Sequence, residues 1–111
     1  MSINREAIRR ATMAVAMEDY YGLSEILWHL RSNYMATATE DELIHEAREI
    51  VRSLIKDGSV RLVRFRMTPT DAWPIDPAEV DQILQATESW RPPPSWDQPY
   101  PALGTDLGDV R

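Results

Sequence analysis

The stretch "SLIKDGSVRLVRF", residues 53–65, joins the end of a helical pattern to the start of a strand pattern. Gly58 favours a helix stop at this junction, because glycine adopts the left-handed backbone conformation at low cost. The residues after it are rich in Val, Leu and Phe with arginines between them, which is typical of a strand. The junction therefore predicts an α+β protein in which a helix is followed at once by a strand.

The apolar residues of this strand do not keep to one face. Val60 and Leu62 share one face of an extended chain, whereas Val63, Phe65 and Met67 share the other. A β-bulge explains such a switch, and so does burial of both faces near one end of the strand. The sequence leaves both explanations open.

The segment "TEDELIHEAREIVRSLIKDG", residues 39–58, predicts the longest helix. Thr39 and Glu42 have the spacing of a capping box. The residues expected to be buried recur at helical spacing and are Leu43, Ala47, Ile50, Val51 and Leu54. On the outer face a basic row is formed by Arg48, Arg52 and Lys56.

Two further helices are predicted before this one. In residues 3–17 an apolar stripe is formed by Ile3, Ala7, Ala11, Ala14 and Val15. In about residues 20–34 the main stripe is formed by Leu23, Ile26, Leu27, Leu30 and Tyr34. A second stripe, formed by Tyr21, Trp28 and Met35, predicts that this helix is buried on two sides. The alternative is that the second stripe contacts a partner, since aromatic residues and methionine are enriched at interfaces.

The chain after the strand reads first as a loop and then as a helix. Pro69 and Pro74 break regular structure, whereas Asp76 and Pro77 have the spacing of a helix cap and a first helical residue. The following stretch "SWRPPPSWDQPY", residues 89–100, is too rich in aromatic residues for a flexible linker. We interpret it as a strap that returns the chain to the sheet and that is pinned to the core by Trp90 and Trp96.

The order of these elements is similar to that of the winged helix-turn-helix superfamily. Leu54, Gly58, Val60 and Leu62 match an L-x-x-x-G-x-V-x-L run that is common where the recognition helix meets the first wing strand. "YPALGTDLGDV", residues 100–110, resembles the second wing strand and the turn after it. The resemblance covers residues 20–67 plus 98–108, and it implies that Tyr100, Ala102 and Leu103 pair beside residues 60–65. It predicts a single, mainly helical α+β domain over residues 1–111. Residues 68–97 are then a helix-containing, Pro/Trp-rich insertion between the strands of a small antiparallel wing sheet.

Charge and composition limit the class of protein. The net charge of −6 comes entirely from residues 68–111, which hold eight acidic residues against Arg91 and Arg111. The chain has no cysteine, its first 20 residues lack a secretory pattern, and no stretch is apolar enough to cross a membrane. We therefore expect a cytoplasmic protein without a membrane partner.

Catalytic and cofactor motifs are missing from the sequence. His45 and Glu46 begin like the zinc-protease pattern H-E-x-x-H, but Glu49 stands in the place of the second histidine. The four glycines are isolated, so they build no phosphate-binding loop. We expect neither an enzyme nor a bound cofactor.

Two binding hypotheses remain. The first is a protein–protein interaction module, such as an inhibitor, an immunity-type protein or a complex subunit, whose acidic C-terminal part attracts a basic partner. Its candidate anchors are Tyr21, Trp28, Met35, Trp73, Trp90 and Trp96. For each tryptophan, packing inside the core is the alternative.

The second hypothesis is a DNA-binding regulator, which the net acidity disfavours. Its candidate contacts are Arg48, Arg52, Lys56, Arg61, Arg64 and Arg66. A remaining alternative is a homodimer of uncertain purpose, formed through the apolar stripe in residues 3–17.

Overall fold

The protein is described by a computed structural model that covers residues 5–18, 20–58 and 60–104. The helices are α1 (Arg5–Glu18), α2 (Leu23–Asn33), α3 (Glu40–Lys56) and α4 (Pro77–Gln85), with a short 3-10 helix, η1 (Thr87–Trp90). The strands are β1 (Tyr21–Gly22), β2 (Arg61–Arg66), β3 (Asp71–Pro74) and β4 (Tyr100–Gly104). The chain is therefore an α+β protein, as predicted.

The ends of α3 follow the predicted chemistry. The Thr39 hydroxyl accepts a hydrogen bond from the Glu42 backbone N–H at 3.2 Å, and the Glu42 carboxylate accepts one from the Thr39 N–H at 2.9 Å. Both bonds satisfy donors that a helix leaves free at its start. At the other end Gly58 has a φ of 78°, the left-handed conformation expected of the residue that stops a helix.

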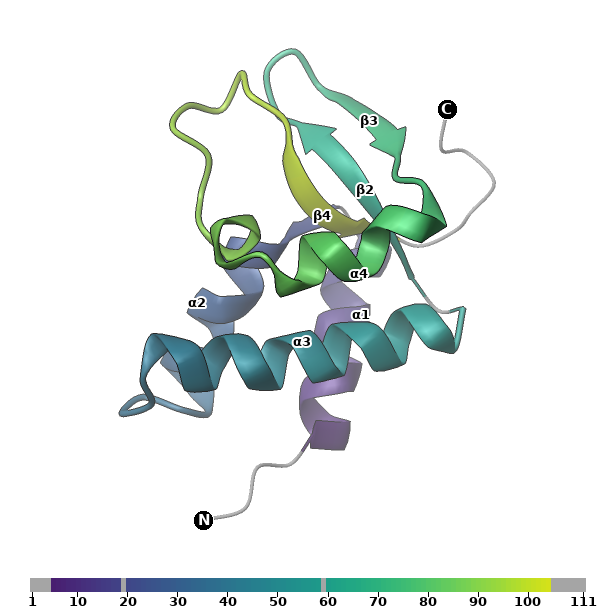
Figure 1. Cartoon of the computed structure of the whole chain (residues 1–111). Coiled ribbons are helices and arrows are strands. Elements are labelled where there is room, and N and C mark those ends of the chain that lie inside the picture. The colour runs from purple at the N-terminus through teal and green to yellow at the C-terminus, as the bar shows by residue number, and fades with distance from the viewer. Residues whose placement is uncertain (1–4, 19, 59, 105–111) are drawn as a thin grey trace.

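The four strands form one antiparallel sheet in the order β1–β4–β2–β3. Figure 1 shows β4, β2 and β3 side by side. Phe65 pairs with Tyr100, Val63 with Ala102, and Leu62 with Leu103. This register confirms that the C-terminal strand returns beside the strand that follows α3. In the sequence, residues 68–97 come between these two paired strands, and they contain β3, α4 and η1.

Both faces of β2 are buried, which explains its irregular apolar pattern. Leu62 packs in the main core against the helices, whereas Val63 and Phe65 belong to a second cluster with Tyr100 and Ala102 on the other face. The register from Arg61 to Phe65 runs without interruption, so no bulge occurs there. Of the two explanations that the sequence left open, burial of both faces is the one observed.

The prediction of a loop immediately after β2 was wrong at residues 71–74. These residues form β3, which pairs antiparallel with Val63 to Arg66 through a short turn. The strand was hidden because it is only four residues long, is mostly exposed and ends in Pro74. Proline is tolerated there because β3 is an edge strand, so one side of its backbone needs no ladder partner.

The predicted faces of the first two helices need correction. In α1 the buried residues are Ile8, Thr12 and Ala16, whereas Ala14 and Val15 are exposed. Ile3 lies outside the described residues. In α2 the main stripe is buried from Leu23 to Leu30, but its last predicted member, Tyr34, follows the helix and is exposed. The helix is not covered on two sides either, because Trp28 of the second stripe is exposed.

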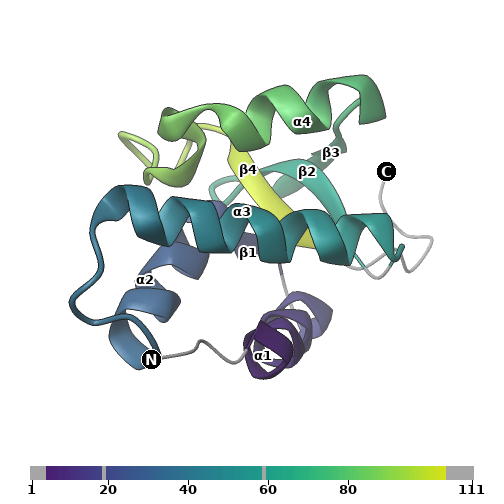
Figure 2. The ribbon, with the colours of Figure 1, turned by 60° about the horizontal axis from the view of Figure 1, so that its bottom comes forward.

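The insertion lies against α3 on the side opposite the first two helices. Figure 2 shows α3 between α4 on one side and α1 and α2 on the other. Trp90 of η1 is 2% exposed and belongs to the main core, so it pins the strap there as expected. The same prediction was wrong for Trp96, which is 47% exposed and lies outside the core. Farther along, the Trp96 carbonyl accepts a hydrogen bond from the Thr68 N–H, which ties the strap to the β2–β3 turn.

Candidate functional site

Two of the six candidate anchors are parts of the core. Tyr21 is 6% exposed in β1, where burial, with a further contribution from the charge of Glu25, raises the pKa of its hydroxyl to about 12. The Trp90 indole N–H donates a 3.0 Å hydrogen bond to the Leu84 carbonyl. Met35 is half-buried and packs against the main core. These three side chains contribute to the fold and offer little surface to a partner.

Trp28 has the opposite environment. Its side chain is 72% exposed on α2, the largest exposed fraction among the large hydrophobic residues that the structure describes. The same helix buries Leu27 and Leu30 completely or nearly so, which fixes Trp28 on the outward side. Its helical neighbours at three- and four-residue spacing include the exposed Arg31 and Ser32, which form a polar border.

Trp73 and Trp96 are partly exposed near the sheet. Trp73 is 36% exposed, and the guanidinium carbon of Arg66 lies 5.0 Å from the centre of its ring. Trp96 is 47% exposed and meets Tyr100 edge-on, with 5.8 Å between ring centres. Both rings have neighbours within the domain, so less of their apolar surface is left for a partner than in Trp28.

The basic row on α3 points toward the insertion. Arg48 donates a 2.9 Å hydrogen bond from Nε to the Leu84 carbonyl in α4. Arg52 forms ion pairs with Asp81 of α4 and with Glu49 of its own helix, both at 3.0 Å. Two members of the row therefore join α3 to α4. Lys56, the third member, is exposed.

The three arginines of β2 differ in their surroundings. Arg66 donates a hydrogen bond to the Pro69 carbonyl, forms an ion pair with Asp71 and lies over the Trp73 ring. Arg61 is half-buried and is engaged in an interaction as well. Arg64 is exposed and forms no ion pair or side-chain hydrogen bond within the described part of the chain.

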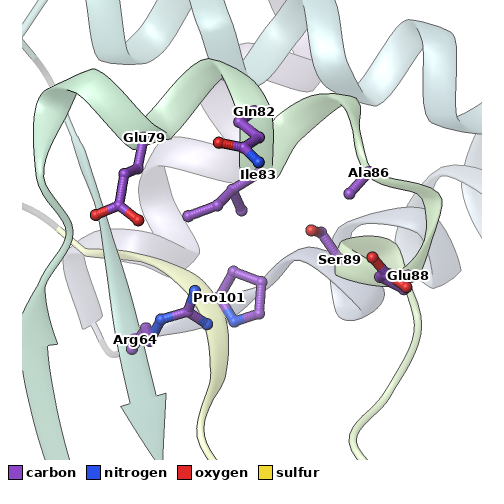
Figure 3. Close-up of a pocket in the computed structure, with 8 residues that line it drawn as sticks. All are labelled: Arg64, Glu79, Gln82, Ile83, Ala86, Glu88, Ser89 and Pro101. Atoms are coloured by element: carbon purple, nitrogen blue, oxygen red, sulfur yellow. The ribbon is translucent and has the colours of Figure 1, made fainter.

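Arg64 lies in a pocket of about 410 Å³ between the sheet and the insertion (Figure 3). The pocket is lined by Arg64 of β2, Pro101 of β4, Glu79, Gln82, Ile83 and Ala86 from α4 and the residue after it, and Glu88 and Ser89 of η1. In Figure 3 Glu79 reaches down from α4 on the side where Arg64 lies, whereas Glu88 and Ser89 lie at the other end. Volumes of this size are typical of sites for small ligands.

The sequence did not single out this pocket. Its residues come from four segments, and only Arg64 was a candidate, as a contact to DNA. The strongest available signal was the predicted pairing of the C-terminal strand with β2, because that register places Pro101 opposite Arg64. No local pattern predicts where α4 and η1 lie relative to that pair.

The described residues contain no group of three or more side chains of the metal-binding types placed to hold an ion. Among the same residues, no helix is both long and apolar enough to cross a membrane. Comparison with known proteins finds no matching family model, no similar curated protein and no similar solved structure. Function is therefore inferred from the surface of the chain itself.

Proposed function

We propose that the protein is a non-catalytic protein–protein interaction module that binds its partner through Trp28 on the outward side of α2. The observation that carries this proposal is the 72% exposure of a tryptophan side chain on an otherwise well-packed helix. Tryptophan is strongly enriched among the residues that dominate binding energy at interfaces. Covering its ring in a partner removes a large apolar area from water, which stabilises a complex.

The position of Trp28 on a well-packed helix favours this role. Leu23, Ile26 and Leu30 hold α2 in the core, so the helix backbone beneath the indole is already ordered. A ring on a rigid helix loses little conformational entropy when a partner covers it. The polar border at Arg31 and Ser32 matches the usual interface plan of an apolar centre inside a wetter rim.

We expect the partner to be a basic protein. It is either the target of this chain, if the chain is an inhibitor or immunity-type protein, or a neighbouring subunit of a complex. In residues 68–104 the acidic side chains are Asp71, Asp76, Glu79, Asp81, Glu88 and Asp97, against Arg91 alone. Such a field raises the association rate of a positively charged protein and is screened by salt. Salt should therefore slow association more than it speeds dissociation.

The DNA-binding alternative has weaker support. Its main support is the order of helices and strands, which is similar to that of winged helix-turn-helix proteins. Against it, Arg48 and Arg52 bind Leu84 and Asp81 of α4, so they are not free to contact phosphates. Arg66 likewise donates a hydrogen bond to the Pro69 carbonyl in the turn between β2 and β3. A protein that binds DNA mostly through phosphates needs several free cations on one surface.

Two experiments test the proposal. Tagged wild-type protein and a Trp28→Ala variant are each used to capture proteins from a native lysate, with Trp96→Ala as the matched control. We expect a protein retained by the wild type and by Trp96→Ala to be lost with Trp28→Ala. Equal retention by all three proteins would contradict the proposal. In parallel, a low-salt gel shift with duplex DNA is expected to show no complex, and a salt-sensitive complex there would favour the alternative.

A further inference from the structure

The pocket around Arg64 contains three charged side chains that have no charged partner. Arg64, Glu79 and Glu88 form no ion pair with any described residue. This sets Arg64 apart from Arg5, Arg9, Arg10, Arg52, Arg66 and Arg91, each of which pairs with a carboxylate. One cation and two anions thus face a shared space without neutralising one another.

The arrangement of these charges is uneven. In Figure 3 Arg64 and Glu79 lie toward one end of the pocket, and Glu88 lies at the opposite end. Between the ends, Figure 3 shows the apolar side chains of Ile83 and Pro101, and Gln82 lies beside Ile83. Gln82 and Ser89 add neutral groups that can donate or accept hydrogen bonds.

We propose that this pocket binds a free basic α-amino acid, of the lysine or arginine type. Such a ligand has one carboxylate and one ammonium group on the same carbon, which match Arg64 and Glu79 at one end. Its side-chain cation then reaches Glu88 at the other end, and its methylene stem covers Ile83 and Pro101. A ligand with one negative and two positive groups is the charge complement of one arginine and two glutamates.

Simpler ligands match the pocket less well. A plain anion pairs with Arg64 but faces the repulsion of two carboxylates, and a plain diamine leaves Arg64 without a partner. A neutral amino acid leaves Glu88 unpaired in a partly enclosed site. Hydrogen bonds between charged groups are stronger than neutral ones, so each unmatched group lowers affinity measurably.

The test is an NMR titration of the full chain with L-lysine, with cadaverine, which lacks the carboxylate, and with L-norleucine, which lacks the side-chain ammonium. For a ligand of this size we expect a dissociation constant of roughly 0.1–1 mM for L-lysine. The two analogues are expected to bind at least about tenfold more weakly, because each leaves one charged group unmatched.

Substitutions test which side chains determine the affinity for L-lysine. Arg64→Met is expected to weaken the binding of L-lysine by at least about tenfold, because the carboxylate of L-lysine loses its partner. The same variant should bind cadaverine at least as tightly as the wild type, because the diamine no longer faces an unmatched cation. Lys56→Met, which removes an exposed cation outside the pocket, should leave both affinities unchanged. Trp28→Ala should also leave them unchanged, so this site and the proposed protein-binding surface are tested separately. No saturable shift of pocket resonances with L-lysine, or equal affinity for all three compounds, overturns the proposal.

Discussion

The indole nitrogen of Trp90 donates a 3.0 Å hydrogen bond to the carbonyl oxygen of Leu84, inside the main core. The same carbonyl accepts a second bond from Arg48 Nε at 2.9 Å. Leu84 lies in the last turn of α4, where a helix leaves carbonyl groups without internal partners. One carbonyl therefore joins α3, α4 and η1, which fixes the insertion onto the helical part of the domain.

Replacement of Trp90 by phenylalanine should lower the free energy of unfolding by about 1–3 kcal/mol. The substitution removes a buried hydrogen bond and leaves space where the indole was. Trp96→Phe is the control, because that ring is 47% exposed, and it should change the free energy by no more than about 0.5 kcal/mol. Urea denaturation followed by circular dichroism measures both, and equal effects of the two substitutions would contradict the assignment.

Deletion of residues 89–111 should destabilise the whole domain. It removes Trp90 from the core and β4 from the middle of the sheet, where β4 pairs with both β1 and β2. Thermal unfolding of the truncated chain should show a greatly lowered melting temperature or no cooperative transition. An unchanged melting temperature would mean that this part of the chain is a dispensable tail.

The ion pair between Arg5 and Glu46 should make stability depend on pH. Two contacts of 2.8 Å join the guanidinium to both carboxylate oxygens, and the hydrogen bond from Arg5 lowers the pKa of Glu46. Because the pKa is lower in the folded state, the stabilisation is present above the ordinary carboxyl range and is lost as the pH falls through the folded-state pKa. Glu46→Gln should cost about 0.5–1 kcal/mol at neutral pH, since Arg5 is half exposed to solvent.

Urea denaturation of the wild type and Glu46→Gln across acidic and neutral pH measures this difference. The difference between the two proteins should shrink as the pH falls below the ordinary carboxyl range, because the Glu46 carboxylate then takes up a proton and the ion pair is lost. Glu88→Gln is the control, because Glu88 has no ion pair among the described residues. A stability difference for Glu46→Gln that stays constant from neutral pH to the lowest pH at which the wild type remains folded would contradict the role given to the ion pair.

Gly104 should be intolerant of a side chain because of Tyr20. A Cβ atom at position 104 would lie 2.7 Å from Cε1 of the Tyr20 ring, which stacks on Phe65 with 4.7 Å between centres. Gly104→Ala should therefore destabilise the protein by about 1–3 kcal/mol. In a Tyr20→Ala background the same substitution should cost less, because the ring is gone. Equal costs in the two backgrounds, measured by denaturation, would show that the clash is not the cause.

Much of the fold followed from local sequence signals. The capping pair Thr39–Glu42 and the stop at Gly58 are short-range chemistry, so they fixed α3 correctly. The pairing of β2 with Tyr100 and Ala102 was also predicted, although it came from a family resemblance rather than from periodicity. The buried face of α1 was predicted wrongly, because Ala7, Ala11 and Ala14 recur on one face at helical spacing. Tertiary packing instead buried the adjoining face, which carries Ile8, Thr12 and Ala16.

The surfaces were less predictable than the fold. A helical stripe of Tyr21, Trp28 and Met35 does not reveal which member points outward, and the structure separates them because Tyr21 belongs to β1. The spacing of the basic row on α3 is that of a DNA-contacting surface, but in the structure Arg48 and Arg52 bind Leu84 and Asp81 of α4. The position of α4 depends on long-range packing, which no local pattern encodes.

The most direct test of the proposed function is site-specific cross-linking beside Trp28 in living cells. A photoreactive amino acid replaces Ser32, one helical turn from Trp28 and exposed, or replaces Asp41 on α3 as the control site. We predict a discrete adduct with another protein from position 32, none from position 41, and loss of the adduct when Trp28→Ala is added. An adduct of unchanged intensity in the Trp28→Ala background, or no adduct from position 32, would contradict the claim that this surface binds a partner.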